Sequence, residues 1–541
     1  MSSPPERNSA ASRTAGPESA WGPLQYPVFR MLWVVWIAAN ICMWMNDVAA
    51  AWMMTSLSPS PMMVALVQSA STLPVFLLGL PSGALADILD RRRYFIFTQI
   101  WVATVASIIC AVILLGWMSA PLLLALTFAN GMGLAMRWPV FAAVVPELVP
   151  RAQLPGALAL NGIAMNASRI IGPILAGAII AAAGSHFVFV LNAVISLVAA
   201  VMIRSWKREA KVSALPAERF LGAIRAGVQH VRQSKPMHVI LLRVSVFFVQ
   251  SMALLALLPL IAKGLHGQGA ASFTLLMAAM GGGAIVAVIF LPRIRQRLDR
   301  NGLVHHGTWV HAIAMSAVAL APNVYVAAPA MMVAGMAWIA VANSLTVAAQ
   351  LVLPDWVRAR GMSIFQMSMM GASAIGAALW GQVATWTDVR TSLVCASVGA
   401  LVFMLLLRRL RLEGLPDEHL TPAEAIHPPS VGQSEDLLGG PLLITVEYRI
   451  DPARTREFIE VMQISRRNRL SQGVLSWSLF HLTTDPAIYI EHFIDESWAE
   501  HLRHFERLTA FDIALRDRRL AFHLGDEPPK VSRYLAQALK V

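Results

Sequence analysis

Three ionisable residues, Asp47, Arg137 and Arg169, lie inside long apolar segments of the sequence. A charged side chain at the centre of a bilayer costs roughly 2.5 to 3.5 kcal/mol, so each residue needs a partner, a cavity or a function. Asp47 could bind and release a proton, while the two arginines could compete for that proton or bind an anion. Asn166 adds neutral polarity three residues before Arg169. These four residues are the candidates for a substrate or proton pathway.

Structural roles compete with this chemistry. Arg169 could instead clamp backbone carbonyls near Gly172 and Pro173, and Asp47 could lie in the outer headgroup zone. The three charges are also expected at different depths: Arg169 near the middle of its segment, Arg137 slightly to the cytoplasmic side, and Asp47 in the outer half. A direct ion pair between Asp47 and Arg169 therefore requires tilted helices or extended side chains.

The composition predicts a polytopic membrane protein. The chain has 541 residues, of which 57% are hydrophobic and 14% charged, and its mean hydropathy is +0.59. These values lie outside the range of ordinary soluble domains. The three cysteines are scattered, which predicts neither a disulfide framework nor a metal site. The net charge of +12 is assigned to loops, and no nucleic-acid partner is expected.

Twelve apolar segments are long enough to cross about 30 Å of hydrocarbon. We expect a disordered tail over 1–27, a six-helix half over 28–203, a connecting loop over 204–236 and a second six-helix half over 237–411. The fold class is therefore all-α, and the lipid bilayer is its environment. The predicted spans are 28–55, 61–85, 94–116, 121–145, 159–182, 186–203, 238–262, 271–292, 305–321, 324–352, 361–384 and 389–407.

The loops between these segments differ in charge. Alternate loops contain 21 Lys and Arg residues, whereas the opposite loops contain only Lys263 and Arg390. Positive residues are retained in the cytoplasm. This bias predicts that both termini are cytoplasmic.

The two halves share a spacing of residues. Pro150 is followed by Gly172 and Gly177, and Pro354 is followed by Gly376 and Gly381 at the same offsets. This shift of 204 residues predicts parallel six-helix repeats, as in transporters whose halves rock about a central site. Chance similarity between apolar segments is the alternative.

The loop after the second segment contains small residues, an acid and three arginines. Gly79 and Gly83 stand on one helix face that a neighbouring helix could approach closely. Asp87 then follows near the end of the helix, where a carboxylate faces the negative end of the helix dipole and needs a compensating partner. The expected partner is an arginine or the start of the eleventh segment near Arg360. The basic residues that complete this motif are Arg91, Arg92 and Arg93.

With these features, the chain resembles the major facilitator superfamily, and the loop over 79–93 resembles that superfamily's signature for conformational switching. Gly172, Pro173 and Gly177 resemble the antiporter signature of export-type members, although Gly-Pro also serves as a packing point. The runs 146–151 and 157–161 are similar to the enterobactin-exporter-like subgroup, the transmembrane secretion effectors. The resemblance implies alternating access, efflux and a location in the inner membrane of a bacterium.

The chain beyond residue 411 has a different character. Residues 412–440 indicate a linker, and 441–541 indicate a soluble domain. Strands are expected over 442–450, 474–483 and 488–495, with helices over 452–470 and from Ser497 to about Leu520. This order predicts a ferredoxin-like α+β domain in the cytoplasm.

The spacing of Arg469, Gly473 and Trp477 resembles the antibiotic-biosynthesis-monooxygenase type of domain, together with Glu491, Trp498, His501 and His504. No nucleophile or cofactor motif accompanies it, so we expect no catalytic residues and no cofactor. His501 and His504 could bind a metal but fit two solvated surface histidines better. The domain is predicted to regulate or to form a homodimer.

The sequence thus favours proton-coupled efflux of a small amphipathic molecule, such as a siderophore or drug, by alternating access. Two alternatives remain. One is uptake of an organic anion, and the other is a membrane-anchored enzyme in which residues 441–541 act as a cofactor-independent monooxygenase.

Overall fold

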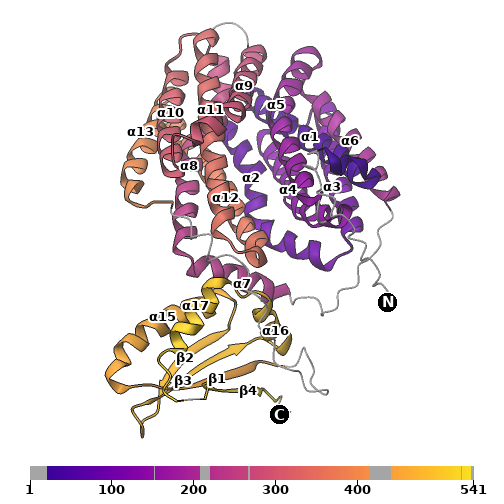
Figure 1. Cartoon of the computed structure of the whole chain (residues 1–541). Helices are drawn as coiled ribbons and strands as arrows, with labels where there is room; N and C mark the ends of the chain where they lie inside the picture. Colours follow the sequence, from indigo (N-terminus) through magenta and orange to yellow (C-terminus); the bar gives the residue numbers. More distant parts are fainter. Residues whose placement is uncertain are drawn as a thin grey trace, which may run out of the picture.

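The computed structural model describes residues 21–150, 153–206, 220–265, 269–412, 440–525 and 527–537. It contains a helical bundle and, beneath it, a small α+β domain, with helix α7 (Phe220–Gln233) between the two (Figure 1). We call the end of the bundle next to this domain the domain end, and the opposite end the far end. The segments 1–20, 207–219 and 413–439, which belong to the predicted tail, connecting loop and linker, lie outside the described residues.

The first half of the bundle has six helices. Each is longer than the apolar segment that predicted it. Their bounds are α1 (Pro27–Leu57), α2 (Pro61–Ile88), α3 (Arg91–Leu114), α4 (Ala120–Leu148), α5 (Leu154–Ala183) and α6 (Ser185–Ser205).

The second half repeats this arrangement. Its helices are α8 (Lys235–Gly264), α9 (Gly269–Arg295), α10 (Arg300–Leu320), α11 (Val324–Val352), α12 (Asp355–Trp386) and α13 (Val389–Leu406). Within the described residues, 11 helices are long and apolar enough to cross a membrane. The remaining bundle helix is α10, the predicted ninth span, which packs against α11 and α13. Its histidines His305, His306 and His311 make it less apolar than its neighbours.

Glycine contacts confirm the two repeats. In the first half, Gly172 packs α5 against α1 and Gly177 packs α5 against α9. In the second half, Gly376 packs α12 against α8 and Gly381 packs α12 against α2. The equivalent glycines thus make equivalent contacts, one within each half and one between the halves.

The tightest helix contact within the second half joins α9 and α11. A Cβ at Gly283 would overlap the backbone carbonyl of Met332, and a Cβ at Gly335 would overlap that of Met280. Backbone atoms cannot rotate away as a side chain can. Only glycine therefore allows these helices to approach so closely.

We expect Gly283→Val to lower the stability of the purified protein by about 1–3 kcal/mol, because the new side chain would push α11 away. Thermal unfolding in detergent would measure this loss. Gly282→Val is the matched control, since a Cβ at Gly282 meets nothing within 4 Å. Equal unfolding temperatures for the two variants would contradict the contact.

The C-terminal domain has a four-stranded antiparallel sheet with the order β2-β3-β1-β4. Its strands are β1 (Leu442–Arg449), β2 (Ser476–His481), β3 (Ile488–Asp495) and β4 (Lys530–Leu535). Helices α15 (Thr455–Ser471), α16 (Trp498–Glu506) and α17 (Ala510–Leu520) cover one side of the sheet (Figure 1). The strand order and helix connections confirm the ferredoxin-like prediction.

Three details of this domain differ from the prediction. Asp451 caps a short 3-10 helix (Pro452–Arg454), and α15 begins only at Thr455. The helix predicted from Ser497 to Leu520 is two helices, because Thr509 and Asp512 form a capping box that starts α17. Strand β4 was not predicted, since this short edge strand lacks the buried alternation that marks a strand.

Candidate functional site

Asp47 lies on α1 and faces α2. The hydroxyl of Ser71 on α2 donates a hydrogen bond to Asp47 Oδ1 at 2.7 Å. The preceding residue, Asn46, is 4% exposed, and neither polar atom of its side chain has a hydrogen-bond partner among the described residues. Polar groups buried without partners are costly and therefore often functional. This part of α1 thus carries a polar site inside the first half.

Arg169 on α5 lies against Trp44 on α1, with its guanidinium carbon 5.3 Å from the ring centroid. The two residues line a small cavity of about 40 Å³, whose other walls come from the second half. The charge of Arg169 therefore lies at the boundary between the halves. The residues that complete this cavity are Leu255, Met277, Met280, Gly281, Ala284, Gly335, Trp338 and Ile339.

Arg137 on α4 has a different setting. Its side chain is 3% exposed and lies over Trp36, 5.6 Å from the ring centroid. Trp36 stacks in turn on Phe141 at 3.9 Å. Cation–π contact of this kind stabilises a desolvated guanidinium by about 2 kcal/mol. Arg137 is thus held by aromatic residues within the first half.

The structure does not join the predicted charges into one cluster. Among the described side chains, no ion pair links Asp47 with Arg169 or Arg137. Each of the two arginines lies against a tryptophan instead, Arg137 against Trp36 and Arg169 against Trp44. The side chain of Asn166 lies outside the described residues. Sequence reasoning considered Trp44 only as a possible apolar lining of a site, and it missed Trp36 and Ser71.

The glycines of the predicted switch motif differ in their surroundings. A Cβ at Gly79 would lie 2.9 Å from Met367 Cγ on α12, so Gly79 allows a close approach between the halves. A Cβ at Gly83 would meet nothing within 4 Å among the described residues, so the close approach expected there is not seen. The shift of 204 residues pairs Gly79 with Gly283, and Gly283 packs within its own half, so the two loops are not equivalent.

Two arginines of this motif contact other helices of the first half. Arg91 forms an ion pair with Glu147 on α4 at 2.8 Å, and Arg92 donates to the backbone carbonyl of Arg204 at the end of α6. Asp90 caps α3 by accepting from the backbone N–H of Arg93 at 2.8 Å. These contacts hold α3, α4 and α6 together at the domain end. The side chain of Asp87 lies outside the described residues, and with it the expected pairing near Arg360.

The predicted antiporter motif lies where α5 meets two other helices. A Cβ at Gly172 would lie 2.5 Å from Trp44 Cβ, which brings α5 onto α1 beside Arg169. Pro173 is buried inside α5. A Cβ at Gly177 would overlap Thr274 on α9. This motif therefore sets both the position of Arg169 and a contact between the halves.

Further contacts join the halves at the far end. Lys263, at the end of α8, donates to the backbone carbonyl of Thr55 on α1 at 2.7 Å. Its ammonium lies 5.7 Å from the ring centroid of Trp52, and Trp52 stacks on Phe273 of α9 at 5.6 Å. Together with Gly177 and Thr274, these residues close the far end in this conformation.

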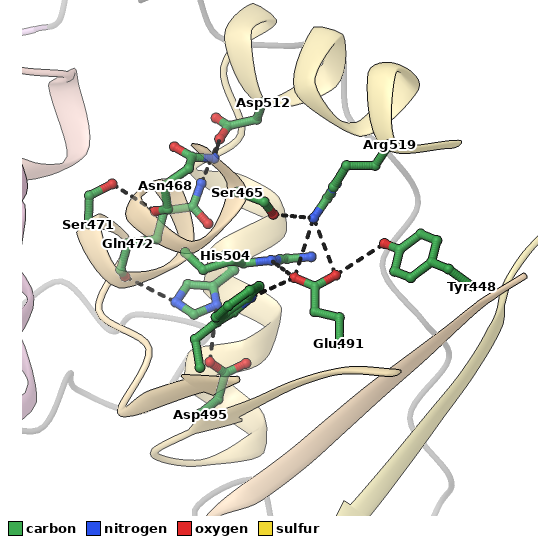
Figure 2. Close-up of polar contacts among 12 residues, drawn as sticks. Tyr448, Ser465, Asn468, Ser471, Gln472, Glu491, Asp495, His504, Asp512 and Arg519 are labelled. Atoms are coloured by element: carbon green, nitrogen blue, oxygen red, sulfur yellow. Dashed lines mark hydrogen bonds and ion pairs between the residues drawn. The ribbon is translucent and has the colours of Figure 1, made fainter. Parts of the chain in front are cut away.

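A second polar cluster lies in the C-terminal domain around Glu491, which is fully buried (Figure 2). Trp477 Nε1 and the Tyr448 hydroxyl donate to its carboxylate at 2.9 and 3.1 Å. Arg519 and Arg469 approach it at 3.4 and 3.6 Å. Burial alone would raise the pKa of Glu491, but the two arginines and the hydrogen bonds from Trp477 and Tyr448 together outweigh it and hold the pKa below its usual value.

The two histidines expected on the surface are in fact buried. His501 and His504 are each 4% exposed because this face of α16 packs on the sheet. His501 Nδ1 lies 2.8 Å from Asp495 Oδ2, and His504 Nδ1 lies 3.4 Å from Asp495 Oδ1. The three residues could hold a metal ion by geometry. However, Arg533 Nε donates to His501 Nε2 at 3.2 Å, and its positive charge opposes a cation there.

The C-terminal domain packs directly on α7. Arg225 of α7 pairs with Glu496 at 3.2 Å, and His230 Nδ1 lies 3.3 Å from the carbonyl oxygen of Ser471. The guanidinium of Arg507 lies over Trp356, at the start of α12, 4.9 Å from the ring centroid. The domain thus contacts the segment that joins the halves and one helix of the second half.

Known proteins share this architecture. The nucleoside transporter NupG superposes with a TM-score of 0.57 at 12% identity, covering 71% of this chain and 99% of that one. A bacterial homolog of the human lysosomal transporter Spinster, crystallised in an inward-facing and unoccupied conformation, gives a TM-score of 0.56 at 14% identity, with coverages of 73% and 98%. At such identities the likeness concerns the fold.

Sequence relatives are transporters rather than enzymes. The staphyloferrin A transporter of Staphylococcus aureus (strain NCTC 8325 / PS 47) is 21% identical over 382 residues, which cover 68% of this chain and 94% of that protein. Macrolide efflux protein A of Streptococcus pyogenes is 22% identical over 298 residues, with coverages of 54% and 73%.

The family model described as transmembrane secretion effector matches residues 18–540, which include both the bundle and the C-terminal domain. The chain therefore belongs to the transmembrane secretion effector family, within the major facilitator superfamily of multi-pass membrane transporters.

Proposed function

We propose that this transporter exports a small amphipathic molecule in exchange for protons, by alternating access between its two halves. The observation that carries this proposal is the position of Arg169. Its guanidinium lies in a cavity whose walls come from both halves, beside the Gly172 contact of α5 with α1. A movement of one half against the other changes that cavity, so binding there and movement are coupled.

The chemistry of the cavity supports an amphipathic substrate with an acidic or electron-rich group. Trp44, Met277, Met280 and Trp338 offer an adaptable apolar surface, and Arg169 offers one positive charge. Asp47 lies on the same helix as Trp44, three residues further on. We propose that its carboxylate exchanges the proton, with the Ser71 hydroxyl stabilising the ionised form.

We infer the direction of transport from the names of the relatives and from the positive charge of the loops. The macrolide efflux protein is an exporter by name, and the positive loops favour a cytoplasmic location for both termini and for the C-terminal domain. The name of the staphyloferrin A transporter suggests a siderophore as one substrate class.

Cells with and without the protein distinguish export from uptake. We expect cells that express it to retain less preloaded staphyloferrin A or erythromycin than cells that lack it, when both are energised equally. The Arg169→Ala variant, which removes the positive charge of the cavity, should retain as much as cells without the protein. Higher retention in expressing cells would instead support uptake of an organic anion.

A further inference from the structure

A cavity of about 320 Å³ lies inside the C-terminal domain, between the sheet and helices α15, α16 and α17. Ile444, Val446 and Phe493 form an apolar wall on the sheet, and Phe505 and Ile513 face them from the helices. Small-molecule sites in proteins have volumes of roughly 300–1,000 Å³ and mostly apolar walls with a few polar groups. The cavity is therefore large enough for a compact ligand with an apolar body.

One side of this cavity has an excess of positive charge. Arg469 and Arg519 both line it, yet among the described residues they share a single carboxylate, that of Glu491. Two guanidinium groups and one carboxylate leave an excess of one positive charge. Arg519 is only 8% exposed, and its Nε has no hydrogen-bond partner in the described part of the chain. A buried donor of this kind is costly unless a ligand satisfies it.

Arg533 adds a second positive charge from β4. It also lines the cavity, and its described contact is the hydrogen bond from its Nε to His501 Nε2. Asp495, on the other side of His501, has its Oδ2 2.8 Å from His501 Nδ1, and its Oδ1 lies 3.4 Å from His504 Nδ1 without a hydrogen bond in the described part of the chain. Asp512, the one carboxylate among the described residues of the cavity wall, accepts from Asn468, Gln472 and Thr509. Asp495 and Asp512 thus have partners within the domain, whereas the guanidinium groups of Arg519 and Arg533 keep N–H donors for a ligand.

The wall of this cavity is also the wall of a second one. A cleft of about 630 Å³ lies between the domain and the ends of α7, α8 and α12, and Asn468, Gln472 and Asp512 line both spaces. Hydrogen bonds among the residues of α15, α16 and α17 connect the wall of the cavity with the wall of the cleft (Figure 2). The backbone carbonyl of Gln472 accepts from His504 Nε2 at 3.1 Å, and that of Asn468 accepts from the Ser471 hydroxyl at 2.7 Å. Ser471 in turn contacts His230 of α7.

We propose that the cavity of the C-terminal domain is a binding site for a small organic anion with an apolar body, and that its occupancy is transmitted to α7. The anionic group lies between Arg519 and Arg533, and the apolar body lies against Ile444, Val446 and Phe493. The contact of Gln472 with Asp512 lies between this site and α7. Because α7 joins the two halves of the transporter, the ligand can change the balance between their conformations.

A matched pair of probes tests the site in the full-length protein purified in detergent. We expect 1-naphthoate to bind at least tenfold more tightly than its neutral analogue 1-naphthamide, measured by calorimetry against a detergent blank. Arg519→Gln and Arg533→Gln should each weaken naphthoate binding at least tenfold. Arg533 is the safer variant for folding, because it pairs with no carboxylate among the described residues.

Arg518→Gln is the control, since Arg518 is an exposed arginine on the same helix as Arg519 and should leave binding unchanged. Equal binding of naphthoate and naphthamide, or undiminished naphthoate binding by folded Arg533→Gln, would overturn the site. These outcomes do not depend on transport, so they are separate from a failure of the proposed export function.

Hydrogen exchange tests the connection to α7. Saturating naphthoate should change the exchange rates of amides in residues 220–233 severalfold in the wild-type protein, and not in Arg533→Gln. Naphthoate binding without any change in these amides would overturn the transmission to α7.

Discussion

Gly177→Val is expected to abolish most transport by opening the far end of the bundle. The new side chain would overlap Thr274 on α9, whose Cβ cannot rotate away from the contact. Overpacking of this kind costs about 1–3 kcal/mol, which changes the ratio of two conformations by about 5- to 150-fold. The measurement is the rate of substrate export from loaded cells or vesicles, with the accessibility of single cysteines introduced at the far end as a second readout.

Two further variants isolate this contact from a general loss of stability. Gly162→Ala changes a glycine of the same helix where a Cβ meets nothing within 4 Å, so it should transport normally. The double variant Gly177→Ala with Thr274→Gly removes the overlapping side chain and should recover transport that Gly177→Ala alone loses. If Gly177→Val transported at the wild-type rate, the contact between α5 and α9 would have no part in the cycle.

Glu491→Gln is expected to unfold the C-terminal domain at much lower temperature. The substitution removes the carboxylate that Arg469 and Arg519 share and weakens the hydrogen bonds from Trp477 and Tyr448. Removing one partner of a buried ion pair costs about 3–5 kcal/mol, which corresponds to roughly 10 °C or more for a domain of this size. The onset of tryptic cleavage within residues 441–537 of the full-length protein, followed by mass spectrometry on heating, would measure it.

Glu457→Gln is the control for that experiment. Glu457 pairs with Arg454 on the surface, where the two side chains are 63% and 49% exposed, and such pairs contribute about 1 kcal/mol or less. A loss as small as that of Glu457→Gln would contradict the account of the buried cluster.

The dependence on pH has a defined sign. Because the pKa of Glu491 is lowered in the folded domain, its stabilising contribution is complete above the usual value of 4.5 and is lost as the pH falls below it. Wild-type and Glu491→Gln domains should therefore become more similar in stability as the pH falls below 4.5. A constant difference through that range would indicate that the carboxylate does not titrate with the domain.

The helices of the bundle could be predicted because membrane spans depend on local composition. Long apolar runs located them, and the common offsets of Gly172 and Gly376 revealed the repeat. The functional contacts could not be predicted in the same way, because they depend on which helix faces which. Trp44 and Trp36 lie beside Arg169 and Arg137, and nothing in the spacing of these residues identifies them as partners.

The C-terminal domain shows the same limit. Alternating residues predicted β1 and β3, but the burial of His501 and His504 depends on how α16 packs on the sheet. The break before α17 did have a local signal, the capping residues Thr509 and Asp512, which the single predicted helix overlooked. The association of two copies through this domain, and the pairing of Asp87, stay predictions.

Proton exchange at Asp47 is the central claim, and substrate-driven proton movement in proteoliposomes tests it most directly. With a pH-sensitive dye inside the vesicles, wild-type protein should move protons when staphyloferrin A or erythromycin is added on one side. Asp47→Asn should abolish this signal while still binding substrate, and Ser71→Ala should only reduce it. Undiminished proton movement by Asp47→Asn, or its absence in wild-type protein that transports either compound, would contradict the account.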